Sequence, residues 1–456
     1  MAQPLTFRRR LGYGAGDFAF NLFFTTASLY LLYYYTDVLG LSPAVAGWVF
    51  AAALMWDALF DPFMGYLANR TRTRWGRYRP YLLFGAAPLA LSWVLIFLPV
   101  KFEGLALIVF AAAAHVLFRT LYAVVSMPYL ALSAVMTSDS AERGVLAGFR
   151  MVSAATCGLL AAFFTLQLVT WFGGGQTGFF WTAVLYGALA TLVFLVVFAN
   201  THEAAAVDTD APPPTPREML HMLGRNRAFW IVCGATLIGS VGGTLFNKTV
   251  PYWFKYTLGR EDLIGPALTA LTAAVTLSIF FWSFLMKRTA KRNVWLSGSG
   301  LVLLAYGLLW FAPETPAAYI PLLALLGFGA GAGYLSFWAM MPDTVEYGEW
   351  RSGVRAEGAI FGLVSLVQKA SLGLAAGVLG ELLGGVGYRA NQAQTPETLA
   401  GMKLIMIALP AGFALVAIAC IAFYPLDQKT HGRLVRVLDR RRARRLDALT
   451  TPEVSL

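Results

Sequence analysis

Residues 44–80 read AVAGWVFAAALMWDALFDPFMGYLAN followed by RTRTRWGRYRP, an apolar block joined to a basic loop. At about 1.5 Å per residue, a helix made by this block is long enough to cross a hydrocarbon layer about 30 Å thick. Asp57 and Asp61 interrupt the block, and a carboxylate is costly inside a membrane. The stretch therefore predicts a spanning helix that carries two unusual charges and ends in a basic loop.

The same pattern recurs along the whole chain. Hydrophobic residues make up 58% of the 456 residues and charged residues only 13%, about half the charged fraction of a soluble domain. We predict an all-α membrane protein with twelve transmembrane helices in two six-helix bundles. The twelve apolar stretches are 13–38, 44–69, 80–100, 104–136, 146–172, 177–199, 228–256, 262–286, 293–312, 316–341, 357–387 and 402–424.

A polar gap separates the first six stretches from the last six. It contains three consecutive prolines and several charges, a composition typical of a solvated linker. The predicted organisation is a first six-helix bundle at 1–199, a cytoplasmic linker at 200–228, a second bundle at 229–425 and a basic cytoplasmic tail at 426–456. This layout is typical of transporters built from two structural repeats.

The net charge of +11 comes from basic residues in alternate short loops and in the last segment, which is a topogenic pattern. It predicts an even number of spans, both termini in the cytoplasm and a bacterial inner membrane location. The expected partner is membrane lipid, and no nucleic acid binding is expected. No obligate protein partner and no cofactor are evident. The three cysteines are far apart in apolar runs, so neither a disulfide framework nor a thiolate metal site is expected.

Ionisable residues inside the apolar stretches are functional candidates because burying them is costly. Asp57 and Asp61 lie one helical turn apart, so they share a face. Two such carboxylates cannot both stay ionised without a cation, which predicts a coupling site for H⁺ or Na⁺. The alternative is a structural pair in which Asp61 interacts with the basic loop. Lys369 needs a carboxylate partner, and this pair is the natural candidate.

Asp17 lies in Gly14–Asn21 (GAGDFAFN), where a carboxylate can accept hydrogen bonds from sugar hydroxyls. Arg150 could share these hydroxyls, hold Asp17 in place or simply anchor a helix at the interface. Aromatic rings offer stacking surfaces for a sugar. The predicted substrate site comprises Asp17, Asn21, Tyr122, Ser126, Arg150, Tyr334 and Ser365.

Other charges default to structural roles. His115 and Arg119 are one turn apart and can satisfy each other, Lys248 can extend outward to the interface, and Glu381 lies near an outer helix end. The histidines make no metal constellation, and no nucleophile–base pair is apparent, so no enzyme activity is expected.

Several motifs resemble the glycoside–pentoside–hexuronide:cation symporters. They are Asp17 in its glycine-rich segment, Tyr35–Gly40, Trp56–Gly65, Arg74–Pro80, Asp343–Glu349, Glu357 and Lys369. The resemblance implies a major facilitator fold and cation-coupled sugar uptake by alternating access. It also implies that Asp57 and Asp61 are cation-site carboxylates, that Lys369 lies beside them, and that Asp17 and Arg150 lie in the sugar site. We assign conformational gating to charged residues in and near these motifs: Arg74, Arg77, Asp343, Glu346, Glu349, Arg355 and Glu357.

The chain departs from the family pattern at four positions. Ser126 and Leu130 replace a sugar-binding aspartate and a tryptophan, and Phe60 and Ala123 replace oxygen-bearing residues near the cation. Fewer oxygens suit Na⁺ poorly, so we predict H⁺ as the coupling ion and a substrate other than a melibiose-like galactoside. A cation-coupled lysolipid or other amphiphile carrier of the same fold is the alternative, and a membrane-embedded enzyme or receptor is a weaker one.

Overall fold

The computed structural model describes residues 5–137, 140–203, 215–354, 357–426, 430–438 and 440. Over these ranges the chain is almost entirely helical, and its one strand-like feature is an isolated bridge between Thr73 and Gly76. The prediction of an all-α protein is confirmed.

The first half of the chain forms a bundle of six long helices. Its first helix, α1, continues through wider π-type turns named η1 and η2, so that helix is unbroken from Phe7 to Val38. The elements of this half are α1 (Phe7–Thr26), η1 (Ala27–Leu31), η2 (Tyr34–Val38), α2 (Pro43–Arg70), α3 (Arg79–Ile96), α4 (Gly104–Met136), α5 (Ser140–Trp171) and α6 (Gly175–Asn200).

The second half repeats this arrangement after a short connecting helix, α7 (Pro216–Gly224). Two of its membrane-length helices also contain π-type turns, η3 and η5. The elements are α8 (Arg227–Tyr252), η3 (Trp253–Thr257), η4 (Glu261–Leu263), α9 (Ile264–Met286), α10 (Lys291–Phe311), α11 (Pro316–Ser352), α12 (Glu357–Gly385), α13 (Pro396–Lys403), η5 (Leu404–Ala408) and α14 (Leu409–Ala422).

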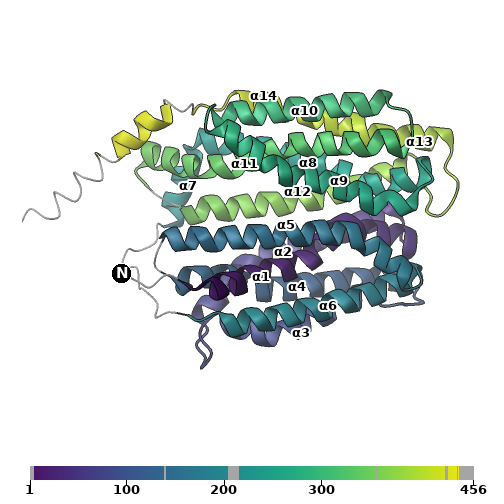
Figure 1. Cartoon of the computed structure of the whole chain (residues 1–456), viewed down its shortest axis with the longest axis horizontal. Helices are drawn as coiled ribbons and strands as arrows, with labels where there is room; N and C mark the ends of the chain where they lie inside the picture. Colours follow the sequence, from purple (N-terminus) through teal and green to yellow (C-terminus); the bar gives the residue numbers. More distant parts are fainter. Residues whose placement is uncertain are drawn as a thin grey trace, which may run out of the picture.

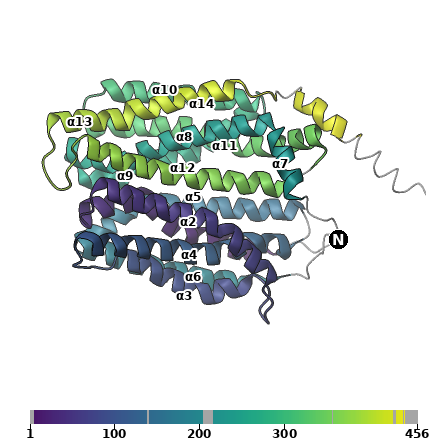
Figure 2. The same cartoon turned by 180° about the vertical axis from the view of Figure 1, so that it is seen from behind.

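The two halves lie side by side, with their helices roughly parallel to one long direction (Figure 1). The view from behind shows the same division, with α2 and α12 adjacent at the seam between the halves (Figure 2). We call the end with the start of α1, the loop 71–78 and α7 the linker face, and the opposite end, which carries α13, the far face.

Eleven helices of the described chain are long and apolar enough to cross a membrane. The helical run from Phe7 to Val38 is the twelfth, since it packs along α5 and α6 over the length of the first half. Arginines at its start and a group of tyrosines near its end make it less hydrophobic than the others. With this run included, the predicted twelve spans are confirmed.

Three elements differ from the sequence prediction. The helix predicted at 316–341 continues to Ser352 and ends where Gly353 takes the left-handed conformation, with φ of 76°. Within the segment predicted to be a solvated linker, α7 starts with a reciprocal hydrogen-bonded cap between Thr215 and Glu218, and it buries Met222 against the second half. The described part of the tail is also helical and buries Leu434. Apolar residues at helical spacing explain both segments.

Small residues let α2 and α12 approach closely at the seam. A Cβ atom on Gly47 would lie 2.5 Å from the carbonyl oxygen of Ala376, and one on Gly380 would overlap Pro43. Lipid tails are as apolar as the helices, so the hydrophobic effect does not drive helices together within a membrane. Close packing of small residues contributes to their association instead.

Replacing Gly47 with leucine should force the two halves apart near the far face. Overpacking costs roughly 1–3 kcal/mol, so we expect Gly47→Leu to melt at a lower temperature than the parent protein in a thermal unfolding assay in detergent. Gly65→Leu is the matched control, because a Cβ on Gly65 of the same helix meets nothing within 4 Å. Equal melting temperatures for the two variants would contradict this packing.

Candidate cation and substrate site

The two carboxylates of α2 meet a lysine of α12 across the seam. Lys369 Nζ lies 2.9 Å from Asp57 Oδ2 and also donates to Asp61 Oδ2. From α4, Arg119 Nη1 lies 3.9 Å from Asp57 Oδ2. The predicted pairing of Lys369 with the α2 carboxylates is confirmed, and Arg119 is an additional member that the sequence did not indicate. We call Asp57, Asp61, Lys369 and Arg119 the seam cluster.

The seam cluster balances its own charge, with two carboxylates and two cations. The side chains of Asp57 and Arg119 are only 1% and 2% exposed, while those of Asp61 and Lys369 are 11% and 20% exposed. Both oxygens of Asp57 are buried and make no hydrogen bond with a described residue, so only ion pairs hold this carboxylate. The side of the cluster formed by Asp61 and Lys369 is therefore its accessible side.

Asp17 and Arg150 form a second ion pair, within the first half. Arg150 Nε donates to Asp17 Oδ2 at 2.5 Å, and Arg150 Nη2 lies 3.3 Å from Asp17 Oδ1. The hydroxyl of Tyr129 donates to the same carboxylate at 2.7 Å, and the guanidinium lies 5.3 Å from the Tyr129 ring centre. Arg150 thus holds Asp17 in place, and Tyr129 is a further residue at this position.

The remaining predicted substrate residues do not form one continuous site. Asn21 donates its amide to the backbone oxygen of Asp17 at 2.8 Å. Tyr122 packs its ring on Phe20, and Ser126 has a buried hydroxyl without a partner in the described chain. Tyr334 and Ser365 come from the second half and are exposed.

Tyr334 opens onto a cavity of about 290 Å³ in the second half. Polar side chains from three helices line this cavity, and the rest of its wall is largely apolar and aromatic. They are Thr236, Ser240 and Asn247 of α8, Ser299 of α10 and Gln368 of α12. Apolar walls with a few placed polar groups are typical of small-molecule sites.

Among the predicted gating residues, Arg74 and Arg77 contact residues of their own half. The Arg74 guanidinium stacks on Trp75 at 4.0 Å, and the Arg77 backbone N–H donates to Glu203 at 2.7 Å. Glu349 lies on the last turns of α11. Arg355 lies outside the described residues, and of Glu357 only its place at the start of α12 is described.

Asp343 and Glu346 form a charged group with two other residues of the second half. Lys291 Nζ lies 2.8 Å from both oxygens of Asp343, and His431 of the tail helix lies 2.6 Å from Glu346. One ligand atom each from Asp343, Glu346 and His431 lie within 4.8 Å of one another, a spacing that suits a metal ion. The expectation that no histidine joins such a constellation is therefore wrong in geometry. Lys291 already neutralises Asp343, which makes an ion pair network the simpler interpretation.

At the far face the two halves meet in a cluster that the sequence did not single out. Asp37 of η2 has a fully buried side chain and pairs with Lys255 Nζ at 2.9 Å. Tyr388 donates to Asp37 Oδ2 at 2.7 Å, and Tyr256 also donates to this carboxylate. Burial and the Asp37 charge raise the pKa of the Tyr388 hydroxyl, which keeps it a donor. We call Asp37, Lys255, Tyr256 and Tyr388 the far-face cluster.

The structural role expected for Lys248 is wrong, and those expected for Arg119 and Glu381 are incomplete. Lys248 does not extend outward: it is buried and donates to the Ser28 backbone oxygen at 2.8 Å, which joins the halves. Arg119 does contact His115, at 3.4 Å, but it also approaches Asp57. Glu381 accepts a hydrogen bond from Trp48 at 2.7 Å and so links α12 to α2.

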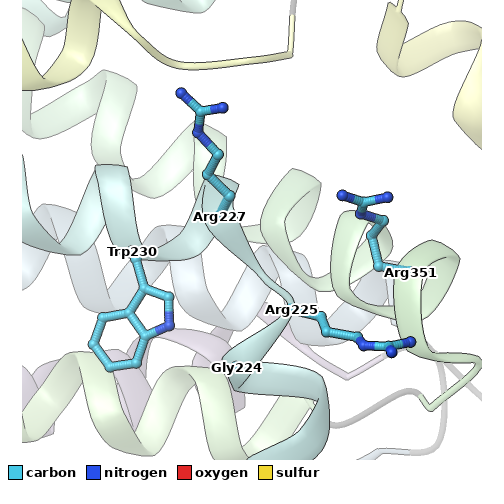
Figure 3. Close-up of a pocket in the computed structure, with 5 residues that line it drawn as sticks. All are labelled: Gly224, Arg225, Arg227, Trp230 and Arg351. Carbon is cyan, nitrogen blue, oxygen red and sulfur yellow. The ribbon is translucent and has the colours of Figure 1, made fainter.

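A separate pocket lies at the linker face, away from both ion pairs. It has a volume of about 750 Å³ and is lined by Gly224, Arg225, Arg227, Trp230 and Arg351. Figure 3 shows the three guanidinium groups and the indole around it. The pocket adds to the positive charge of this face.

Comparison with known proteins agrees with this architecture. The inward-open xylose transporter XylE of E. coli superposes with a TM-score of 0.66 over 94% of this chain and 98% of its own, at 12% identity. At that identity the likeness shows the fold alone, and the fold is that of a major facilitator transporter.

Sequence relatives narrow the class. The profile described as MFS/sugar transport protein matches residues 12–428. The isoprimeverose transporter of Lactiplantibacillus pentosus is 32% identical over 92% of this chain and 88% of its own. The glucuronide carrier protein homolog of Escherichia coli (strain K12) is 31% identical over 97% of both. The chain belongs to this sugar transport family of the major facilitator superfamily, as a glycoside–pentoside–hexuronide:cation symporter, and it is a transporter and not an enzyme.

Removing the charge at the centre of the far-face cluster should weaken the contact between the halves at the far face. Breaking a buried ion pair costs about 3–5 kcal/mol, and we expect the lower end for Asp37→Asn because Lys255 reaches solvent. A lower melting temperature in detergent would show this effect. Asp262→Asn is the control, since Asp262 forms an exposed pair with Arg260 that is worth about 0–1 kcal/mol. Identical melting of both variants and the parent would refute the role of the cluster.

Proposed function

We propose that this protein takes up a sugar or glycoside by symport with protons, through alternating access of a site between its halves. The observation that carries the proposal is the seam cluster, in which Asp57 and Asp61 of one half share Lys369 of the other. A charge network that joins two rigid halves can couple ion occupancy to their movement.

Asp17, Arg150 and Tyr129 supply the hydroxyl-binding side of the site. The ion pair of Asp17 and Arg150 is partly exposed, with side-chain exposures of 15% for Asp17 and 25% for Arg150. A ligand can therefore reach both groups. An ionised carboxylate accepts and a guanidinium donates, which suits neighbouring hydroxyls on one sugar. Tyr334 and Gln368 offer an aromatic ring and an amide from the second half.

Asp61 is the group that exchanges the proton. Asp61 has one cationic partner, whereas Asp57 lies between Lys369 and Arg119. Asp61 is also the more exposed of the two carboxylates. A proton on Asp61 removes its attraction to Lys369, which then stays with Asp57. In the empty carrier Lys369 neutralises the site, so no unpaired charge has to cross the low-dielectric interior when the halves rock.

A proton fits this site better than Na⁺ does. Hard cations require several oxygen ligands, whereas a proton needs one carboxylate oxygen. Here Lys369 already occupies the position between the carboxylates. The neighbouring Phe60 packs on Trp56, and Ala123 is buried, so neither position supplies a side-chain oxygen.

The orientation follows from charge. The linker face carries Arg70 to Arg79 and the three arginines around the pocket in Figure 3. Basic loops stay in the cytoplasm, so we place the linker face and both termini there, in a bacterial inner membrane. The far-face cluster then closes the outer side, and we interpret this conformation as closed to the outside.

Proteoliposomes can identify the coupling ion directly. With a panel of labelled xylosides, galactosides and glucuronides, we expect at least one solute to accumulate when an inward proton gradient is imposed. We expect no accumulation when a sodium gradient is imposed at equal pH on both sides. Accumulation driven by sodium alone would overturn the proton assignment while leaving symport intact.

Neutralising Asp61 should separate transport from coupling. Asp61→Asn mimics the permanently protonated carboxylate, so we expect the solute to equilibrate across the vesicle membrane without accumulating against its gradient. The measurement is the ratio of internal to external labelled solute under a proton gradient. Asp262→Asn, an exposed carboxylate on the far face, should keep parental accumulation. Full accumulation by Asp61→Asn would refute the role of Asp61.

A further inference from the structure

The pocket shown in Figure 3 lies where two elements of the second half meet at the linker face. The turn between α7 and α8 contributes Gly224 and Arg225, the start of α8 contributes Arg227 and Trp230, and the end of α11 contributes Arg351. Its volume of about 750 Å³ lies in the range of small-molecule sites, about 300–1,000 Å³. The pocket shares no residue with the seam cluster or with the proposed substrate site.

Within the described chain, the wall of this pocket carries three positive charges and no negative one. None of Arg225, Arg227 and Arg351 forms an ion pair with another described residue. The Arg351 guanidinium lies 5.4 Å from the Trp350 ring centre, and that contact leaves its charge uncancelled. Guanidinium groups bind phosphate oxygens through two parallel hydrogen bonds. Three of them around one space therefore favour an anionic ligand that carries a phosphate.

Hydrogen bonds hold the two walls of the pocket together. The buried side chain of Asn226, which separates two of the arginines, accepts from the Phe229 N–H at 3.0 Å and donates to the Thr344 carbonyl of α11 at 2.8 Å. The Trp230 indole N–H donates to the Leu223 carbonyl at 2.8 Å. These bonds fix the turn between α7 and α8 against α11, so the three guanidiniums extend from a packed corner of the fold.

Helix lengths place the pocket at the level of the lipid headgroups. The segment from Arg227 to Thr257 has 31 residues, which at about 1.5 Å each extend about 46 Å. A bilayer with its headgroups is about 40–45 Å thick, so both ends of this segment lie among headgroups. α11 is longer still, with 37 residues, so Arg351 on its last turn also lies past the hydrocarbon. Trp230 is 50% exposed, and exposed tryptophans are enriched at this interface.

We propose that this pocket binds an anionic phospholipid, with the lipid phosphate among the three guanidiniums and the glycerol backbone against Trp230. Basic pockets between spanning helices on the cytoplasmic side recognise anionic headgroups. A soluble phosphate compound would use the same arginines but would gain nothing from an exposed indole at the membrane surface. The bound phosphate joins the turn after α7 to the end of α11, so it stabilises this corner of the second half.

Native mass spectrometry of the purified full-length protein in detergent tests the assignment. The probes are dioleoyl-phosphatidylglycerol, which is anionic, and dioleoyl-phosphatidylcholine, which has the same acyl chains and no net charge. Wild type should bind one phosphatidylglycerol at least about tenfold more tightly, since each basic residue near an anionic headgroup contributes about fivefold. The pocket variant, Arg225→Gln with Arg227→Gln and Arg351→Gln, should bring this ratio to near one.

A second triple variant is the matched control. Lys287→Gln with Arg288→Gln and Arg292→Gln removes three charges around the turn between α9 and α10, on the same face but outside the pocket. It should retain the wild-type ratio. A preference that survives in the pocket variant would overturn the assignment. Equal loss in both triple variants would overturn it as well, since the lipid would then respond to the charge of the whole face.

Competition separates a lipid from a soluble phosphate. Glycerol phosphate and inorganic phosphate carry the same anion without acyl chains. At the concentration of the lipid, either compound should leave most of the phosphatidylglycerol bound. Full displacement by either one would show that the pocket takes a soluble phosphate and would overturn the lipid assignment.

Thermal unfolding provides a second measurement if the pocket variant folds poorly. A ligand that binds only the folded state raises the melting temperature, so phosphatidylglycerol should raise that of the wild type more than phosphatidylcholine does. Arg351→Gln changes one exposed side chain and leaves the turn between α7 and α8 intact. It should show a smaller difference between the two lipids. A difference equal to that of the wild type would contradict the proposed site.

Discussion

Two carboxylates of α2 and one ammonium of α12 meet across the seam of the molecule, where an unpaired charge would cost several kcal/mol. Lys369 is held by Asp57 and Asp61, and Arg119 closes the network from α4. The halves therefore depend on each other for electrostatic balance. Helices at the seam can approach this closely because glycines replace larger side chains, as at Gly47. Packing and charge act at the same interface.

Two groups of charged contacts between the halves stand out in the described chain, one at the centre and one at the far face. Asp37 receives Lys255, Tyr256 and Tyr388 at the far face, while the seam cluster lies nearer the midplane. A carrier that rocks must break the far-face contacts and keep the central charges paired. The far-face contacts are one ion pair and two hydroxyl donors around the buried carboxylate of Asp37. In the seam cluster, Asp57 and Arg119 are buried while Asp61 and Lys369 are partly exposed, which makes the occupancy of Asp61 the natural control point.

Much of the site could be predicted because burying charge is costly wherever it occurs in an apolar run. That rule identified Asp57, Asp61 and Lys369, and it required Lys369 to find its partner in another helix. The sequence did not predict the position of Lys248, which is buried between the halves and does not reach the interface. Asp37 and Lys255 were passed over because each lies at the end of a helix, where charges are usually exposed. Asp37 and Lys255 lie at equivalent places, near the end of the first long helix of each half. This correspondence was the signal in the sequence that could have indicated their pairing.

By itself the sequence determined the class of protein: twelve apolar helices, their division into two halves and the central acidic pair. Hydrophobic length and charge cost are local properties, so they can be read along the chain. Only the tertiary structure decided that Arg119 joins Asp57 and that Lys248 faces the same cavity as Arg119. These relations depend on the rotation of each helix about its axis, which is set by packing against its neighbours and is not encoded in any one segment.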